Sequence, residues 1–244
     1  MEPTERLYWQ DDHCFACDAS VVAVRERQIA FNRTCFYPGG GGQPADEGEI
    51  RFHDGACVQV TGVHADTGGV IWHCLSEAPP DSVIGERAHL SIDIDRRIAL
   101  ARYHTVLHVL NTIALQDYAA AITCVQIGVD YSRIDFRWEG FSAALREELE
   151  AKVNAVLERQ CRLKAYYLSE AEFQARPDLL RTLEVKPPVI DGRVRVVEIE
   201  GFDAQACGGT HAPTTREVGR FSIFKTENKG RINKRLYVRL HGLV

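Results

Sequence analysis

Two pairs of metal-binding side chains constrain this chain more than any other feature. His104 and His108 stand four residues apart, and so do Cys207 and His211. Almost a hundred residues separate the two pairs. A zinc finger would separate them by roughly a dozen residues. If all four side chains bind one ion, a folded domain must bring the pairs together, because a metal-nucleated mini-domain does not span such a distance.

The chemistry of the four side chains favours zinc. His104 and His108 fall within a predicted helix, where residues four apart lie on one face. The segment from Cys207 to His211 contains two glycines, which permit a tight, irregular loop. One sulfur and three nitrogens suit tetrahedral zinc. Each pair alone is weak evidence, since the histidines could be a polar helix face and the other pair a nucleophile and its base. Their joint occurrence predicts a Zn²⁺ site.

The number of protein ligands leaves the role of the metal open. Four protein ligands are typical of a structural zinc, whereas a catalytic zinc keeps one position for water or substrate. One ligand could be displaced, the ion could become five-coordinate, or the metal could only position other groups. The sequence does not choose among these possibilities.

The periodicity of apolar residues changes near residue 92. Residues 1–92 contain short Val-, Ile- and Phe-rich stretches between turns, which predicts an all-β domain, either a small barrel or a sandwich. Residues 93–244 predict an α+β domain, with two long helices beside an antiparallel or mixed sheet. The helices are expected at Arg96–Gln116 and Ser142–Cys161, a capping box at Ser169–Glu172, and strands at 122–129, 131–138, 195–200, 218–226 and 234–240.

Composition narrows the setting. The 244 residues carry a net charge of -5, which argues against non-specific coating of nucleic acid. No apolar run approaches a membrane span, and the polar start does not resemble a secretory signal. We therefore expect no membrane association, a cytoplasmic location and reduced cysteines. Cys14 and Cys17 form a lone CxxC that is expected to be two ordinary thiols, and the other cysteines outside the predicted zinc site are expected to be buried: Cys35, Cys57, Cys74, Cys124 and Cys161.

Several motifs together resemble a known family. Residues 198–211 read Glu-x-Glu-Gly-Phe-Asp-x-x-x-Cys-Gly-Gly-Thr-His, and they follow the helical histidine pair. Residues 37–48 contain a Gly-Gly-Gln-x-x-Asp-x-Gly segment. These motifs, spread over nearly the whole chain, resemble the editing domain of alanyl-tRNA synthetase, which is related to a domain of the threonyl enzyme. The chain is too short for an aminoacylation domain as well, so it is most similar to the freestanding AlaX type with an N-terminal barrel before the zinc domain.

The resemblance implies hydrolysis of tRNA-Ala mischarged with serine, and glycine is a second candidate substrate. An apolar alanine pocket rejects serine poorly, whereas a site that hydrogen-bonds the seryl hydroxyl can discriminate by about 10⁴–10⁵. The candidate catalytic residues are Gln43 and Thr210. The candidate substrate-binding residues are Gln126 and the loop glycines Gly39, Gly40, Gly41 and Gly42. Alternatively, Gln126 is a solvent-facing strand residue and the glycines form a simple hairpin loop.

A basic segment supplies candidate tRNA contacts. Residues 216–239 contain eight Lys/Arg against two Glu, a balance of +6 that leaves -11 for the rest of the chain. The first candidates for phosphate contacts are Lys225, Lys229, Arg231, Lys234 and Arg235, followed by Arg96, Arg97 and Arg102. The alternative is a solvated basic strand face.

Two other functions compete with the hydrolase. A non-enzymatic, zinc-stabilised RNA-binding module would agree with four protein ligands. The acidic overall charge and the lack of interleaved aromatic residues for base stacking argue against such a module. A general zinc hydrolase or deaminase would be indicated by His-Glu-x-x-His or by His-x-Glu with Pro-Cys-x-x-Cys. Neither motif occurs, because Thr105 follows His104 and no Glu lies between the histidines.

Overall fold

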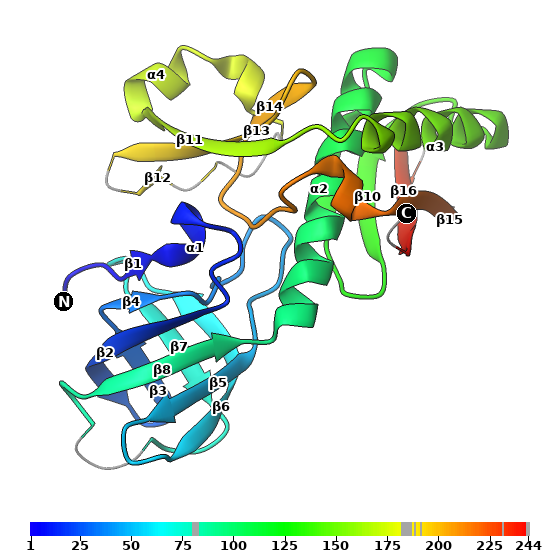
Figure 1. Cartoon of the computed structure of the whole chain (residues 1–244). Helices are drawn as coiled ribbons and strands as arrows, with labels where there is room; N and C mark the ends of the chain where they lie inside the picture. Colours follow the sequence, from blue (N-terminus) through cyan, green and yellow to red (C-terminus); the bar gives the residue numbers. More distant parts are fainter. Residues whose placement is uncertain (80–82, 182–186, 188, 191, 231, 243–244) are drawn as a thin grey trace. The chain divides into compact units, whose positions relative to one another are not determined.

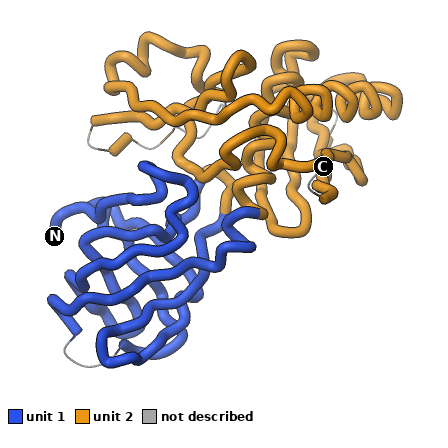
Figure 2. The backbone as a smooth tube through the Cα atoms, viewed as in Figure 1, with its two compact units in different colours: residues 1–40, 44–98 blue, residues 41–43, 99–244 orange. Residues whose placement is uncertain are grey.

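The computed structural model describes residues 1–244 except 80–82, 182–186, 188, 191, 231 and 243–244 (Figure 1). Its backbone divides into two compact units (Figure 2). Unit 1 comprises residues 1–40 and 44–98, and unit 2 comprises residues 41–43 and 99–244. The three residues Gly41–Gln43 therefore belong to unit 2, although unit 1 flanks them in the sequence.

Unit 1 is built on a closed, six-stranded antiparallel barrel in the order β2-β3-β7-β6-β5-β8. Closure leaves no unpaired barrel edge. Alternation sets the inside and outside, as in β6, where Val58 and Val60 are buried, and a β-bulge before Gly62 shifts the next buried residue to Val63. The predicted small barrel is thus confirmed. Its strands are β2 (Ala16–Arg25), β3 (Gln28–Phe31), β5 (Gly48–Phe52), β6 (Cys57–Ala65), β7 (Ile71–Leu75) and β8 (Arg87–Ile92).

A few short elements accompany the barrel. The strands β1 (Glu5–Arg6) and β4 (Arg33–Thr34) pair in parallel, and the single-turn helix α1 spans Leu7–Gln10. The all-β expectation missed α1. Its N-cap residue Arg6 makes no side-chain capping bond, so the sequence carries no start signal there. Packing holds the turn in place, since the Tyr8 side chain is buried in the barrel core.

Unit 1 buries an ion pair that corrects one sequence-based expectation. Arg97 and Asp46 form a salt bridge in which each side chain is only 1% exposed. Arg97 also donates to the carbonyl oxygens of Cys35, at 2.7 Å, and of Asp12, at 3.1 Å. All three guanidinium nitrogens are thus engaged. Arg97 is therefore a structural residue, and its predicted role as a phosphate contact is wrong.

The predicted helices are present. Helix α2 (Ile94–Tyr118) begins in unit 1 and continues into unit 2, and α3 (Ala143–Glu158) lies wholly in unit 2. The Ser142 hydroxyl caps α3 by accepting from the Leu145 amide at 3.2 Å. The expected capping box opens α4 (Glu170–Gln174), where Ser169 and Glu172 bond reciprocally. Within the described part of the chain, no helix is long and apolar enough to cross a membrane.

Unit 2 contains two four-stranded antiparallel sheets, whereas the sequence suggested one antiparallel or mixed sheet. The first has the order β15-β16-β10-β9 and shares a core with α2 and α3. The second has the order β11-β13-β12, with β14 also paired to β13. The missed strand β11 is mostly exposed, so it lacks a buried alternating pattern. The strands of the two sheets are β9 (Ala121–Gln126), β10 (Ser132–Arg137), β15 (Arg220–Asn228), β16 (Asn233–His241), β11 (Leu163–Ser169), β12 (Val189–Ile190), β13 (Arg193–Ile199) and β14 (Asp203–Ala206).

Candidate metal centre

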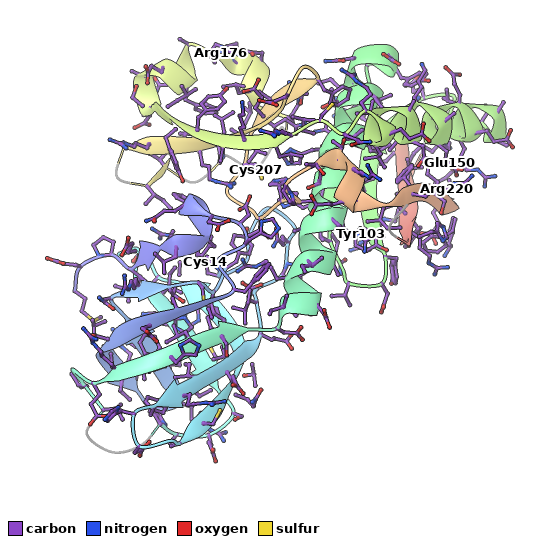
Figure 3. The ribbon with its side chains drawn as sticks, viewed as in Figure 1. Cys14, Tyr103, Glu150, Arg176, Cys207 and Arg220 are labelled. Carbon is purple, nitrogen blue, oxygen red and sulfur yellow. The ribbon has the colours of Figure 1, made fainter. Side chains whose placement is uncertain are left out.

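Unit 2 brings the two distant pairs of side chains together. His104 and His108 lie on successive turns of α2, and Cys207 begins the loop after β14 (Figure 3). One ligand atom from each of His104, His108, Cys207 and His211 falls within 4.8 Å of all the others. This is the one such group of three or more His, Cys, Asp or Glu side chains among the residues that the structure describes.

The distances within the cluster fit a metal ion. The Cys207 Sγ lies 3.4 Å from His104 Nε2 and 3.4 Å from His211 Nε2. Tetrahedral bonds of about 2.3 Å to sulfur and about 2.0–2.1 Å to nitrogen would separate those atoms by about 3.5 Å. The three imidazoles are buried, whereas Cys207 is partly exposed. An ion held here would therefore be accessible from the side of the thiol.

A buried glutamine fixes the tautomer of His104. The Gln43 Oε1 lies 2.8 Å from His104 Nδ1, and it also accepts from the Thr210 amide at 3.1 Å. The Gln43 side-chain nitrogen donates to the Thr210 hydroxyl at 2.8 Å. Because a carboxamide oxygen only accepts, His104 carries its proton on Nδ1. Its Nε2, the atom near the Cys207 sulfur, is left with a lone pair for a metal.

Thr105 fixes the tautomer of His211 in a similar way. Its hydroxyl donates to the Ala101 carbonyl at 2.9 Å and accepts from the Ala212 amide at 3.0 Å. His211 Nδ1 lies 3.2 Å from that hydroxyl oxygen and is the third partner. Since the single hydroxyl proton already goes to Ala101, the Nδ1 of His211 must be the donor. The Nε2 of His211 is then unprotonated beside the Cys207 sulfur.

The third imidazole, His108, has a ring nitrogen without a hydrogen-bond partner among the described residues, the buried Nδ1. Burial lowers the pKa of His108 to about 3, assisted by the charges of Arg181 and Arg195. Burial also holds the pKa values of His104 and His211 well below the ordinary range. All three imidazoles are therefore neutral near pH 7, which is the form that binds metals.

The loop from Cys207 to His211 is held by Arg195, which sequence reasoning missed. Its guanidinium donates to the carbonyl oxygens of Cys207, at 3.2 Å, and Gly209, at 2.8 Å. The Cys207 amide in turn donates to the Arg195 carbonyl at 3.0 Å. Arg195 is 2% exposed and lies between the buried Val194 and Val196 of β13. A charged residue between two valines was the available signal, just as Thr105 was a hydroxyl within a buried helix.

Comparisons with known proteins identify the family. Residues 194–237 match the family described as "Threonyl and Alanyl tRNA synthetase second additional domain", and residues 12–96 match "tRNA synthetases class II (A)". The chain is 35% identical to the alanyl-tRNA editing protein AlaX-M of Methanosarcina mazei, covering 97% of this chain and 96% of that protein. The chain belongs to the AlaX-M family of alanyl-tRNA editing proteins.

Further relatives also match over nearly the whole of this chain. The AlaX-M protein of Saccharolobus solfataricus is 33% identical, over 96% of this chain and 98% of that protein. The alanine–tRNA ligase of Korarchaeum cryptofilum is also 33% identical, over 91% of this chain but only 25% of the ligase. The resemblance to AlaX-type proteins, inferred from the motifs, is thereby confirmed, as is the α+β fold with its barrel.

In this AlaX-M family member, half of the glycine-rich loop lies in unit 2. Gly41 and Gly42 belong to that unit, and the Gly42 carbonyl accepts from the Ile127 amide at 2.8 Å. Gly42 has φ +86°, and a Cβ there would lie 2.7 Å from the Val125 carbonyl oxygen. A side chain at this position is therefore excluded. Gly39 and Gly40 belong to unit 1, where the Tyr37 hydroxyl donates to the Gly40 carbonyl at 3.0 Å.

Gln126 lies at the end of β9, next to the residue that bonds the glycine loop. Val125 packs against the core of unit 2, so Gln126 points to the opposite face of the sheet and is exposed. It stands opposite Arg133 of β10. Its role in the substrate pocket stays a prediction, as do the roles of Gln43 and Thr210.

The predicted phosphate-contacting residues already have protein partners. Lys225 and Lys229 both pair with Glu227, and Arg235 binds Asp135 through two nitrogens at 2.7 Å. In addition, Lys234 bonds Asn228, Arg96 pairs with Glu47, and Arg102 donates to the Val218 carbonyl. Arg231 lies outside the described residues. The basic segment is thus partly neutralised by its own carboxylates.

The remaining cysteines need one correction. Cys35 is buried as expected, but Cys57 and Cys124 are exposed and Cys74 and Cys161 are partly exposed. The expectation that all five are buried is therefore wrong. The outward positions alternate with inward ones along a strand, so a cysteine's face depends on register.

Proposed function

We propose that this chain is a zinc-dependent aminoacyl-tRNA deacylase that removes serine from mischarged tRNA-Ala, with glycine as a second candidate substrate. The observation that carries the proposal is the convergence of His104, His108, Cys207 and His211, with one partly exposed member, in one buried cluster. The full-length relatives named as alanyl-tRNA editing proteins supply the substrate class. A cytoplasmic location follows from the proposed role in translation.

Zinc is the metal that this donor set favours. One thiolate and three imidazoles are typical of zinc, whereas magnesium and calcium take oxygen ligands. When bound, zinc would polarise the ester carbonyl or lower the pKa of an attacking water. The four side chains would hold the ion, and the tautomers fixed by Gln43 and Thr105 leave the Nε2 atoms of His104 and His211 free to bind it.

The close packing around the cluster supports a shaped, water-poor pocket. A Cβ on Gly209 would lie 2.3 Å from the His104 ring and 2.8 Å from Gln43 Oε1, so the chain passes directly over the histidine. Only Cys207 of the four is partly exposed. The aminoacyl ester would therefore approach from the thiol side, near the loop that carries Thr210.

Selection of serine requires a polar partner for the seryl hydroxyl. Thr210 and Gln126 are our candidates. A hydroxyl-reading site rejects alanine because the buried polar groups are then left unpaired. Exchanging Gln126 for methionine, an apolar side chain of similar length, should lower the preference for seryl over alanyl esters. An unchanged preference would remove Gln126 from the pocket and leave Thr210.

The direct test is deacylation of Ser-tRNA-Ala and Ala-tRNA-Ala by the purified chain, with its zinc content measured in parallel. We expect rapid loss of serine, slow loss of alanine, and no acceleration by a folded Cys207→Ala variant. The matched control is Cys161→Ala, which removes a partly exposed thiol outside the cluster. If the zinc-loaded protein binds tRNA but accelerates neither hydrolysis, the non-enzymatic RNA-binding module becomes the better account.

A further inference from the structure

Three aromatic rings gather on one face of the sheet β15-β16-β10-β9. Ring centroids lie 5.9 Å apart for Tyr131 and Phe224, 6.2 Å for Tyr131 and Tyr237, and 6.1 Å for Phe224 and Tyr237. Each ring thus contacts both others. Tyr131 is 47% exposed and Phe224 is 41% exposed. We refer to Tyr131, Phe224 and Tyr237 as the aromatic platform.

The strand register explains why the rings meet on the outward face. Leu236 and Val238 of β16 are buried in the core of unit 2, so Tyr237 between them points away from it. A β-bulge interrupts β15 between Ile223 and Lys225. Such an irregularity places two residues of one strand against one of its partner, so Phe224 and Lys225 both reach the side of Tyr237.

Cations lie beside these rings. The Lys225 Nζ is 4.9 Å from the Tyr237 ring, and the Arg239 Cζ is 4.4 Å from the Phe224 ring. Arg133 of β10 stands opposite Tyr237 in the register. Lys225 also pairs with Glu227, but within the described residues no carboxylate forms a salt bridge with Arg133 or Arg239. The Nε of Arg133 is buried without a hydrogen-bond partner among those residues.

Exposed rings next to unpaired guanidinium groups suit one class of ligand. Unpaired nucleotides offer a flat base for stacking on an aromatic ring and a phosphate for an arginine. A base-paired helix offers the phosphates but keeps the faces of its bases stacked inside. The sequence pattern did not reveal this group of rings beside the basic side chains, because the rings come from three separate segments.

We propose that the aromatic platform stacks unpaired nucleotides of the bound RNA, while Arg133 and Arg239 contact the adjacent phosphates. The identity of that RNA as tRNA rests on the proposed function. A second copy of this chain is a poorer occupant. A symmetric dimer would place the same patch against itself, which brings Lys225, Arg133 and Arg239 close to their own counterparts.

The test compares short unstructured RNA with a blunt RNA duplex of the same length, using fluorescence anisotropy and the full-length chain. Phe224→Leu and Tyr131→Leu keep apolar side chains but remove the flat rings. Each should weaken single-strand binding by roughly 10-fold and leave duplex binding unchanged, since stacking contributes only to unpaired bases. The control is Tyr167→Leu, which alters a comparably exposed tyrosine on β11 of the other sheet and should change neither affinity.

The salt dependence of binding tests the proposed phosphate contacts of the arginines. Arg239→Gln should reduce the salt dependence of single-strand binding by about 0.7 in the logarithmic slope, the value for one phosphate contact. Arg193→Gln, at an exposed arginine of β13, serves as the control and should leave the slope unchanged. An unaltered slope for Arg239→Gln would remove that residue from the phosphate contacts.

Failure of the platform can be told apart from failure of the proposed hydrolase. If the wild type hydrolyses Ser-tRNA-Ala but Phe224→Leu and Tyr131→Leu bind unstructured RNA as the wild type does, the platform is refuted and the hydrolase stands. If the wild type hydrolyses neither ester, but Phe224→Leu and Tyr131→Leu each weaken single-strand binding, the platform is supported and the hydrolase is refuted. Concentration-dependent self-association that disappears in Phe224→Leu, with RNA binding intact, would assign the patch to a dimer contact instead.

Discussion

The two units bury polar side chains in contrasting ways. In unit 1, every guanidinium nitrogen of the buried Arg97 donates to Asp46 or to a backbone carbonyl. The buried His73 hydrogen-bonds the Thr34 hydroxyl through one ring nitrogen and the Ile29 carbonyl through the other. In unit 2, His104 and His211 each bond a neighbouring side chain through Nδ1. The Nε2 atoms of both rings face the same Cys207 sulfur, each at 3.4 Å.

This difference separates a structural polar group from a functional one. Buried polar atoms in folded proteins are nearly always paired within the protein, because an unpaired one costs free energy. The barrel satisfies that rule with its own atoms. In the cluster of unit 2, one thiol faces two unprotonated Nε2 atoms, so its single proton satisfies at most one of them, whereas a bound ion would satisfy both. Substitutions in each unit test this contrast.

Loss of a metal ligand should have the largest effect. Apparent zinc-binding free energies of about 10–16 kcal/mol are shared by four ligands, so Cys207→Ala should weaken zinc binding on the order of 100- to 1000-fold. Competition with a chromophoric chelator measures the affinity. Cys161→Ala should bind zinc as the wild type does, because Cys161 lies outside the cluster. Equal affinity of the two variants would contradict the four-ligand site.

Removing the charge of Asp46 from its ion pair with Arg97 should lower the free energy of unfolding without changing zinc binding. Asp46→Asn leaves the Arg97 guanidinium buried and uncompensated, at a cost of about 3–5 kcal/mol in the free energy of unfolding. Denaturant unfolding measures the loss, and zinc content should stay at the wild-type level. Glu77→Gln, at an exposed position, is the control. A stability equal to that of the control would mean that the pair is not structural.

The acid sensitivity of the barrel should depend on His73. Burial lowers the pKa of His73 from 6.5 to about 4. Below pH 6.5 the unfolded chain takes up a proton that the folded chain refuses, so stability is lost as the pH falls from about 6.5 towards 4. The loss from this group is about 3 kcal/mol. The variant His73→Gln should flatten the dependence of unfolding on pH over that range, whereas His53→Gln, at an exposed histidine, should retain the wild-type slope.

Removing the hydrogen-bond partner of one metal-binding histidine should have the smallest effect on zinc affinity. Gln43→Ala leaves all four ligands but frees the Nδ1 of His104, and partners of this kind contribute about 10–100-fold to metal affinity. The variant Gln43→Glu keeps an acceptor for His104 and should recover most of the affinity. Gln28→Ala, which removes a glutamine bonded to Cys74 in the barrel, is the matched control. If Gln43→Ala binds zinc normally, the tautomer of His104 is set by something else.

The sequence allowed the four-residue cluster and the helices to be predicted because their signals are local. The His pair repeats at the helix spacing, the Cys207–His211 loop carries its glycines, and Ser142 and Ser169 mark helix starts. Barrel strands show the inside–outside alternation. These features depend on neighbours within a few residues, so they are readable without the fold.

The remaining features depend on contacts between distant segments. Gln43 meets Thr210 across 167 positions of the chain, and Arg97 meets Asp46 across 51. The hydrogen bonds of the Gln43 side chain and the burial of Arg97 could therefore not be predicted from the spacing of residues in the sequence. The split into two sheets and the aromatic platform have the same origin, since strand order decides which residues become neighbours.

We propose that four protein side chains hold one zinc ion. X-ray absorption at the zinc edge, on protein with its metal content determined, tests it most directly. We expect one zinc per chain, with one sulfur at about 2.3 Å and three nitrogen or oxygen neighbours at about 2.0–2.1 Å. A shell made only of light atoms, or a protein that retains no zinc after exposure to it, would contradict the account.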